Sequence, residues 1–263
     1  MNFTLYTVDA FTDVPFQGNP AAVCISDGPC DEHWMRLVAR EMNLSETAFV
    51  HPVAGGYSLR WLTPTVEVDL CGHATLAAAF VLWHTGTLGV AQKARFHTRS
   101  GWLECVREGD WIALDFPSMP ATACEAPAGL VEALGCEALA TGFNGMDYLV
   151  EVADAEVLRA LKPDLGALAG LKSRGVIVTS LSDSPHWDFL SRFFAPGAGV
   201  DEDPVTGSAH CALGPYWGEK LGKIELRAYQ ASRRGGELSV VLAGERVVLR
   251  GRAVLMSRVA LQH

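Results

Sequence analysis

The chain has 263 residues, of which 49% are hydrophobic, and a formal net charge of −9. This length lies between one large domain and two small ones, and the apolar content is sufficient for a substantial core. An acidic chain lacks the basic footprint of a nucleic-acid-binding protein, so we expect no nucleic-acid partner.

From the sequence we expect neither a membrane span nor a secretory signal. The longest apolar candidate, "ATLAAAFVLWHTG" (Ala74–Gly86), is shorter than a bilayer span and contains a histidine. The start of the chain has neither the basic nor the long apolar segment of a secretory signal. The seven scattered cysteines form no C-x-x-C pair, which argues against a disulfide framework. Together these features predict a cytoplasmic protein that does not contact a membrane.

The first half of the chain reads as short strands with two helices. The strand-like runs, bounded by Gly, Pro, Asp and Asn, are typical of antiparallel sheets; they are 2–11, 21–26, 47–53, 57–63, 66–70, 94–98, 101–106 and 110–116. A helix is predicted over Asp31–Met42, with Asp31 as its N-cap. Its apolar face is expected to hold Trp34, Leu37, Val38 and Met42. A second helix, Thr75–Trp83, is apolar on nearly every side and should be buried all round.

The second half of the chain shows the same pattern of short strands with a few helices. Strands are predicted at 148–152, 175–181, 188–195, 237–244 and 246–257, and helices at 127–135, 154–161 and through 212–222. Pro117–Pro127 has three prolines and little periodicity, which favours a domain boundary. We therefore expect a first lobe at 1–118, with a central helix at about 75–86. The second lobe would be 119–263, with a central helix at about 208–222, and its last strand could return to the first lobe.

The two halves contain an imprecise internal repeat. "EVDLCGHATLAAAFVLWHTG" (from Glu67) aligns with "DPVTGSAHCALGPYWGEKLG" (from Asp203), so that Cys71-Gly72-His73 matches Thr206-Gly207-Ser208. A helix that begins at a glycine offers free backbone N–H groups and a positive dipole end. Two such helix starts facing each other would bind an anion. The other interpretation is two ordinary buried helices that begin with glycine.

Four motifs in order resemble those of the phenazine-biosynthesis PhzF-like family, within the diaminopimelate epimerase and proline racemase fold. They are "DAFTDVPFQGNPAAV" (Asp9–Val23), "EMNLSETAFV" (Glu41–Val50), "RWLTPTVEVDLCGHATLA" (Arg60–Ala77) and "DEDPVTGSAH" (Asp201–His210). The resemblance covers nearly the whole chain. It implies an α+β fold of two similar lobes, each a barrel-like, mostly antiparallel sheet around a central helix, with the active site in the cleft between them.

The resemblance also implies roles for particular residues. Glu46 in "NLSETAF" takes the place of the family's proton-transferring acid/base, and desolvation should raise its pKa toward neutrality. The local alternative, helix capping by Asn43 and Glu46, is disfavoured because a strand-like run follows. His73 would donate to, or protonate, the substrate, and Asp203 would hold its amino or hydroxyl group.

The backbones at Gly72, Gly207 and Ser208 would bind a substrate carboxylate. The neighbouring acids Asp201 and Glu202 read as solvated turn residues, and His210 and Cys211 as residues packed inside the helix.

The cysteines decide between two mechanisms within this fold. Epimerases of the fold use one cysteine at each helix start, and Cys71 occupies the first such place. The second place holds Thr206, whose hydroxyl is too weak an acid to replace a thiol. A zinc site of Cys71, His73, His210 and Cys211 is disfavoured because adjacent helix residues point about 100° apart. We expect no bound metal.

The sequence thus predicts a cofactor-independent isomerase in which Glu46 moves a proton between carbons of a small carboxylate-bearing substrate. Two alternatives remain: an epimerase or racemase of a small amino or hydroxy acid, and a non-catalytic protein that binds small acids. The substrate is not determined by the sequence, and a homodimer is left open.

Overall fold

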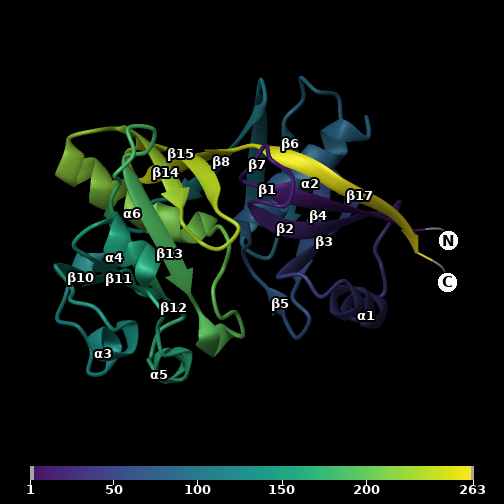
Figure 1. Ribbon diagram of the computed structural model, residues 1–263. Coiled ribbons are helices and arrows are strands. Elements are labelled where there is room, and N and C mark those ends of the chain that lie inside the picture. Colours follow the sequence, from purple (N-terminus) through teal and green to yellow (C-terminus); the bar gives the residue numbers. More distant parts are fainter. Residues whose placement is uncertain (1–2, 262–263) are drawn as a thin grey trace. The chain divides into compact units, whose positions relative to one another are not determined.

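The structure, a computed structural model, describes residues 3–261. The chain divides into two compact units (Figure 1). Unit 1 runs through Asp115 and resumes at Arg250, and unit 2 is Phe116–Leu249. The expected boundary at 118 thus lies three residues after the observed one, and the chain after Arg250 belongs to unit 1.

In the described part of unit 1, residues 3–115 and 250–261, the chain forms two helices and a mixed, mostly antiparallel sheet. The helices are α1 (Glu32–Met42) and α2 (Gly72–His84). The strands are β1 (Phe3–Ala10), β2 (Asn19–Ile25), β3 (Glu46–Val53), β4 (Gly56–Leu62), β5 (Glu67–Val68), β6 (Ala94–Thr98), β7 (Gly101–Glu108), β8 (Trp111–Pro117) and β17 (Ala253–Leu261). The last strand, β17, pairs antiparallel with β1, so the two ends of the described chain lie side by side (Figure 1).

Unit 2 contains four α-helices, a short 3₁₀ turn and the remaining strands. The helices are α3 (Leu130–Leu134), α4 (Ala155–Ala160), α5 (Leu165–Ala169) and α6 (Gly207–Leu221), and the 3₁₀ turn is η1 (Pro196–Ala198). The strands are β9 (Thr122–Ala123), β10 (Ala140–Phe143), β11 (Asp147–Glu151), β12 (Gly175–Leu181), β13 (Phe189–Phe194), β14 (Glu225–Gln230), β15 (Gly236–Ala243) and β16 (Arg246–Gly251).

The same order of strand pairing occurs in both units. In unit 1, the pairs β1·β2, β2·β3, β3·β4, β4·β6 and β6·β7 alternate antiparallel, parallel, antiparallel, parallel and antiparallel. In unit 2, the pairs β10·β11, β11·β12, β12·β13, β13·β14 and β14·β15 follow that alternation. The internal repeat seen around the two glycine-led helices therefore extends to the topology of each unit.

Each unit has one helix enclosed by its sheet. In α2, ten of the thirteen residues are buried, and the helix packs on β1, β2, β3 and β17. In α6, nine of the fifteen residues are buried, and the helix packs on β14 and β15. This arrangement confirms the predicted two-lobed α+β fold with a central helix in each lobe. Both helices begin at the glycines of the internal repeat, Gly72 and Gly207, whereas the ranges read from apolar periodicity began at about 75 and 208.

The ends of α1 agree with the prediction, but its buried face differs from the predicted one. Asp31 is the N-cap of α1, and its Oδ1 accepts a hydrogen bond of 2.9 Å from the Trp34 backbone N–H. The buried residues are Met35, Val38 and Ala39, whereas Leu37 is 43% exposed. The prediction that Leu37 belongs to the core face is wrong, because Leu37 is turned about 100° from Val38 around the axis.

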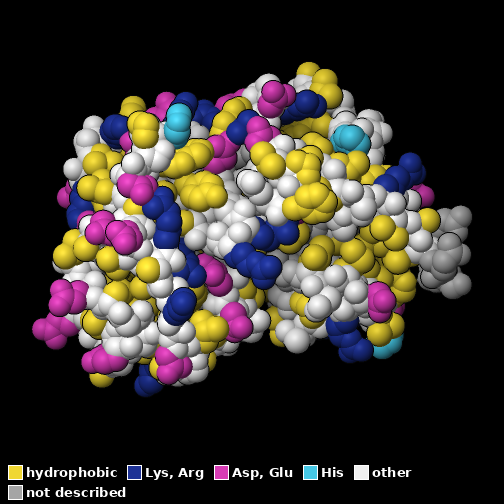
Figure 2. Space-filling model, in the orientation of Figure 1, with side chains coloured by type: hydrophobic (Ala, Val, Ile, Leu, Met, Phe, Trp, Pro, Cys, Tyr) yellow, Lys and Arg dark blue, Asp and Glu magenta, His cyan; other side chains and the backbone are white. Residues whose placement is uncertain are grey.

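Within residues 3–261, no helix has the length and apolar character needed to cross a membrane. Acidic and basic side chains are interspersed among apolar ones on the face drawn in Figure 2.

Candidate functional site

Glu46 and His73 come together in unit 1, although 27 positions separate them in the sequence. Glu46 is the first residue of β3, three positions after Asn43, the left-handed residue that ends α1. His73 is the second residue of α2. His73 Nε2 lies 3.2 Å from Glu46 Oε2, and the side chains are only 6% and 16% exposed, respectively. The capping interpretation of Glu46 is excluded, since this residue begins a strand.

The imidazole of His73 is surrounded by polar groups on both ring nitrogens. Its Nδ1 lies 3.2 Å from Asn19 Nδ2 and 3.5 Å from Cys71 Sγ. Its Nε2 lies 3.3 Å from Ser45 Oγ, in addition to Glu46. Burial lowers the pKa of His73 to about 3. The ring is therefore neutral at pH 7, which suits a hydrogen-bond donor better than an imidazolium acid.

Asn19 and Ser45 were missed as contacts of His73 when the sequence was read alone. Both lie inside the motifs that carry the family resemblance, Asn19 in "GNPAAV" and Ser45 in "NLSETAF". Their place in these motifs could have marked both as candidate site residues. The motifs do not show that His73 is their partner, because His73 lies 54 positions from Asn19 and 28 positions from Ser45.

Cys71 is the N-cap residue of α2, and it makes no side-chain capping bond. Its backbone carbonyl accepts from the Thr75 hydroxyl at 2.6 Å and from the Thr75 N–H at 3.2 Å. One ligand atom each from Glu46, Cys71 and His73 lies within 4.8 Å of the others, so these residues could hold a metal ion. They differ from the cysteine and histidine set considered from the sequence.

In unit 2, Asp203 and Thr206 are joined just before α6. Thr206 Oγ1 donates to Asp203 Oδ2 at 2.5 Å. Gln230 of β14 bonds to both: its Nε2 donates to the Asp203 backbone oxygen at 2.7 Å and to Thr206 Oγ1 at 3.1 Å. The Thr206 backbone N–H donates to Gln230 Oε1 at 2.8 Å. Gln230 thus fixes the segment that leads into the helix, and nothing in the sequence indicated it.

Ser208, the second residue of α6, contacts an ion pair whose carboxylate is buried. Arg174 Nη2 donates to Ser208 Oγ at 3.0 Å. The same guanidinium binds Asp147 through two hydrogen bonds, and the Asp147 side chain is fully buried. A cation therefore lies beside the start of α6, where the helix dipole also favours negative charge.

The remaining residues of the acidic stretch have different environments. Asp201 is exposed, as predicted. Glu202 forms a two-point ion pair with Arg192, at 2.7 and 3.0 Å, so its prediction as a solvated turn residue is wrong. His210 and Cys211 are buried inside α6, as predicted. His210 Nδ1 lies 2.8 Å from the Thr206 carbonyl oxygen, and burial lowers the pKa of His210 to about 4.

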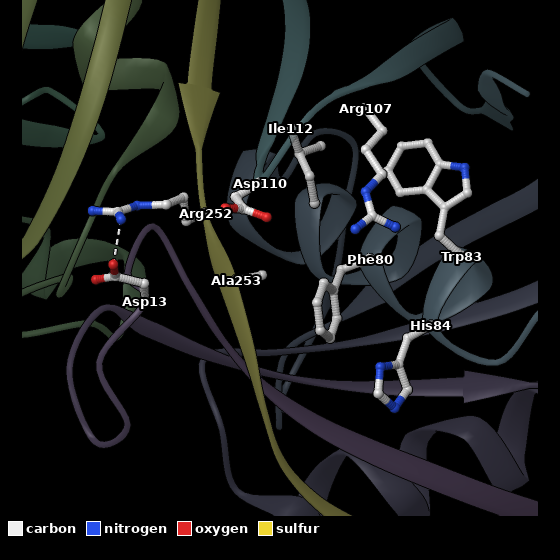
Figure 3. A pocket seen from close by; sticks show the side chains of 9 residues that line it. All are labelled: Asp13, Phe80, Trp83, His84, Arg107, Asp110, Ile112, Arg252 and Ala253. Carbon is white, nitrogen blue, oxygen red and sulfur yellow. Dashed lines mark hydrogen bonds and ion pairs between the residues drawn. The ribbon is translucent and has the colours of Figure 1, made fainter. Parts of the chain in front are cut away.

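A separate pocket of about 260 Å³ lies in unit 1 at the last turns of α2. Its lining residues are Asp13, Phe80, Trp83, His84, Arg107, Asp110, Ile112, Arg252 and Ala253. Figure 3 shows Arg252 joined to Asp13, with Arg107 and Phe80 on the opposite side. His84 and His73 are eleven residues apart on α2, about 16 Å along the helix. The pocket is thus distinct from the Glu46–His73 cluster.

The unit 1 cluster has the parts needed for proton transfer. A mostly buried carboxylate stands next to a neutral imidazole, and both are anchored by regular secondary structure. A carboxylate in such a setting can accept a proton and return it. The start of α6 in unit 2, with Arg174 and the Ser208 hydroxyl, has the donors that a carboxylate group requires.

Comparison with known proteins gives consistent matches along the whole chain. Residues 8–258 match the family model described as phenazine biosynthesis-like protein, PhzC-PhzF. A relative named "uncharacterized isomerase" from Halalkalibacterium halodurans is 52% identical over 259 residues, 98% of each chain. One of the same description from Pseudomonas aeruginosa is 52% identical over 255 residues, 97% of each chain.

Solved structures agree with these matches. A PhzF-family phenazine biosynthesis protein from Enterococcus faecalis has a TM-score of 0.96 at 40% identity and covers 100% of both chains. A hydroxyproline epimerase from Agrobacterium vitis has a TM-score of 0.63 at 12% identity, with 99% of this chain and 91% of that chain covered. The latter likeness concerns the fold alone.

Proposed function

The chain belongs to the PhzC-PhzF family of phenazine biosynthesis-like proteins, and we propose that Glu46 is the acid/base of a cofactor-independent isomerisation in it. Relatives that are 47–52% identical are named isomerases, and this chain is an enzyme of the isomerase kind. The observation that carries the assignment of Glu46 is its 3.2 Å contact with His73 in a site where both side chains are mostly buried.

In the proposed reaction, the Glu46 carboxylate removes a proton from a carbon next to a carboxylate or conjugated group. The electron pair of the broken C–H bond moves into that group. Glu46, now protonated, gives the proton to a different carbon of the same molecule, and a new C–H bond forms there. The substrate neither gains nor loses electrons, so the reaction is an isomerisation.

The other predicted residues have supporting roles in this proposal. His73, being neutral, donates a hydrogen bond and does not act as an imidazolium acid. Asp203 binds an amino or hydroxyl substituent, and the backbones of Gly72, Gly207 and Ser208 stabilise negative charge on the substrate. Each donor of this kind is worth about 3 kcal/mol when it acts on charge that develops in the transition state. The substrate class is a small carboxylic acid.

Two alternatives receive less support. A two-cysteine epimerase needs a second thiol, and the equivalent position holds Thr206, whose hydroxyl already donates to Asp203. A non-catalytic acid-binding protein would not need a mostly buried carboxylate beside a neutral imidazole. A cytoplasmic location and a homodimer are further parts of the proposal.

Proton exchange in deuterium oxide tests the proposal even while the substrate is unidentified. The wild-type protein is incubated with a panel of small unsaturated, hydroxy and amino acids, and deuterium incorporation is measured by mass spectrometry. Glu46→Gln should bind the same ligand and lose exchange by about 10²-fold or more. Glu41→Gln, an exposed residue of the same motif, is the matched control and should exchange like the wild type. Near-normal exchange by Glu46→Gln would show that Glu46 is not the acid/base.

A further inference from the structure

Asn19, Ser45 and His73 form a closed ring of hydrogen-bonding groups. Asn19 Nδ2 lies 3.2 Å from His73 Nδ1. Ser45 Oγ donates to Asn19 Oδ1 at 3.3 Å and lies 3.3 Å from His73 Nε2. Asn19 and His73 are buried, so these contacts are shielded from competing water.

With the Asn19 amide oriented as in the structure, only one direction of donors fits all three contacts. An amide nitrogen only donates, so His73 Nδ1 must accept from Asn19 and carries no proton. The single proton of the neutral ring is then on Nε2. Nε2–H donates to Ser45 Oγ, and the Ser45 hydroxyl donates onward to Asn19 Oδ1. In this direction each of the three contacts has one donor and one acceptor.

A Glu46 carboxylate disfavours the opposite direction. If the Asn19 amide were turned by 180°, its oxygen would face Nδ1 and require a proton there. Nε2 would then present a lone pair to Glu46 Oε2 at 3.2 Å. Two acceptors at that distance repel each other unless Glu46 itself carries a proton.

We propose that Asn19 and Ser45 are positioning residues that hold His73 as the Nε2–H tautomer, so that the ring nitrogen next to Glu46 carries a proton and not a lone pair. The expected effect of the tautomer on turnover rests on the proposed role of Glu46, whereas the tautomer itself does not. In the catalytic cycle, Glu46 gains a proton from the substrate and later loses it, while the Nε2 proton stays on His73. His73 is then a fixed donor and not a proton relay.

The tautomer can be measured directly by ¹⁵N NMR on protein labelled at histidine. Long-range correlations from the ring protons distinguish a protonated from an unprotonated ring nitrogen. The His73 signals among the eight histidines are assigned by their loss in His73→Gln. At pH 7 the wild type should show Nε2 protonated and Nδ1 unprotonated. A wild-type ring with its proton on Nδ1 would overturn the proposal.

Asn19→Asp tests whether Asn19 determines the tautomer of His73. The aspartate side chain is nearly the same size as that of asparagine, but its carboxylate can only accept a hydrogen bond from Nδ1. The variant should place a proton on Nδ1 and lower kcat by about 10²-fold. Asn144→Asp is the matched control, since Asn144 in unit 2 uses its Oδ1 as an acceptor for the Met146 and Asp147 N–H groups. The control should leave the His73 spectrum unchanged. An unprotonated Nδ1 in a folded Asn19→Asp variant would contradict the role of Asn19.

Ser45 supplies a second pair of variants. Ser45→Ala removes the middle of the ring and should lower kcat about tenfold with little change in KM, as expected for one hydrogen bond. Ser45→Thr keeps the hydroxyl and should restore most of the rate. Equal rates for the wild type and Ser45→Ala would contradict the role of Ser45.

The two readouts separate this inference from the proposed function. The NMR measurement needs no turnover, so the tautomer is decided even if Glu46→Gln proves active. Conversely, an essential Glu46 with a His73 proton on Nδ1 would leave the proposed reaction intact and refute the ring. If Asn19→Asp does not fold, the wild-type spectrum and the Ser45 pair still decide the outcome.

Discussion

The Thr206 hydroxyl donates a 2.5 Å hydrogen bond to Asp203 at the start of the central helix of unit 2. Thr206 occupies the position that matches Cys71 in the internal repeat, and its oxygen also accepts from Gln230. A hydroxyl engaged in this way does not act as the partner of a catalytic thiol.

Cys71→Ser should therefore keep most of the activity. The serine is close in size, and no second thiol is available at position 206 to complete a pair of acid and base groups. Activity is measured as deuterium incorporation into the substrate identified with the panel. A rate within about threefold of the wild type is expected, well below the 10²-fold effects of removing an acid/base. A collapse of the rate would favour a cysteine mechanism.

Gly207→Val and Gly72→Val should weaken binding of a small carboxylate. Both glycines are the first residues of the enclosed helices, where backbone N–H groups have no partner within the helix and can bind an anion. A branched side chain would obstruct that approach, and loss of one bond to a charged group corresponds to about a tenfold or larger rise in Kd.

The measurement is titration calorimetry with the ligand found by exchange. Gly28→Val serves as the control, because a Cβ at Gly28 would meet nothing within 4 Å. Unchanged affinity in both helix variants would exclude backbone binding at these glycines.

Gly18→Ala should destabilise unit 1 strongly. Gly18 has a φ of +68°, and a Cβ there would lie 2.2 Å from the Ala10 carbonyl oxygen. The left-handed backbone and the clash together should cost about 3 kcal/mol. Gly86→Ala is a matched control, with a φ of +71° and nothing within 4 Å, and should cost about 1 kcal/mol. Urea denaturation compares the two, and equal losses would refute the role of the close contact.

Arg174→Gln should destabilise unit 2, because the fully buried carboxylate of Asp147 would lose its ion-pair partner. Breaking such a pair from one side costs about 3 kcal/mol. The double variant Arg174→Gln/Asp147→Asn removes the buried charge as well and should recover part of the loss. Urea midpoints measure both changes. A double variant less stable than the single one would indicate that Asp147 is stabilised by other groups.

Stability should fall on acidification from pH 6.5 toward pH 4. Burial lowers the pKa of His73 to about 3 and that of His210 to about 4, from 6.5. In this range the unfolded chain binds protons that the folded protein does not, so the free energy of unfolding decreases as the pH falls. Each histidine contributes a slope of about 1.4 kcal/mol per pH unit.

His210→Gln should reduce the pH dependence of the free energy of unfolding between pH 4 and 6.5 by the contribution of one histidine, about 1.4 kcal/mol per pH unit. The free energy of unfolding is measured from urea denaturation at intervals between pH 4 and 8. Above pH 7 the slopes of the variant and the wild type should coincide, because neither state of His210 binds a proton there. An unchanged slope below pH 6 would show that His210 is protonated in the folded protein.

The sequence by itself identified the family, the two enclosed helices and the candidates Glu46, His73 and Asp203. These features are local: apolar periodicity marks a buried helix, and short motifs mark residues of a known kind of site. Asp31 was likewise found as a cap because its signal lies within four residues of the helix start. The starts of α2 and α6 at Gly72 and Gly207 agree with the glycine-led starts of the internal repeat, whereas apolar periodicity alone placed the start of α2 at Thr75.

The tertiary structure decided which polar groups touch each other. The ring of Asn19, Ser45 and His73 and the pairing of Arg174 with Asp147 join residues that are far apart in the sequence. Polar side chains have no periodicity that reveals their partners, and such contacts exist only after strands and helices have packed. The neutral state of His73 follows for the same reason, because it depends on burial by the whole of unit 1 and not on its neighbours in the chain.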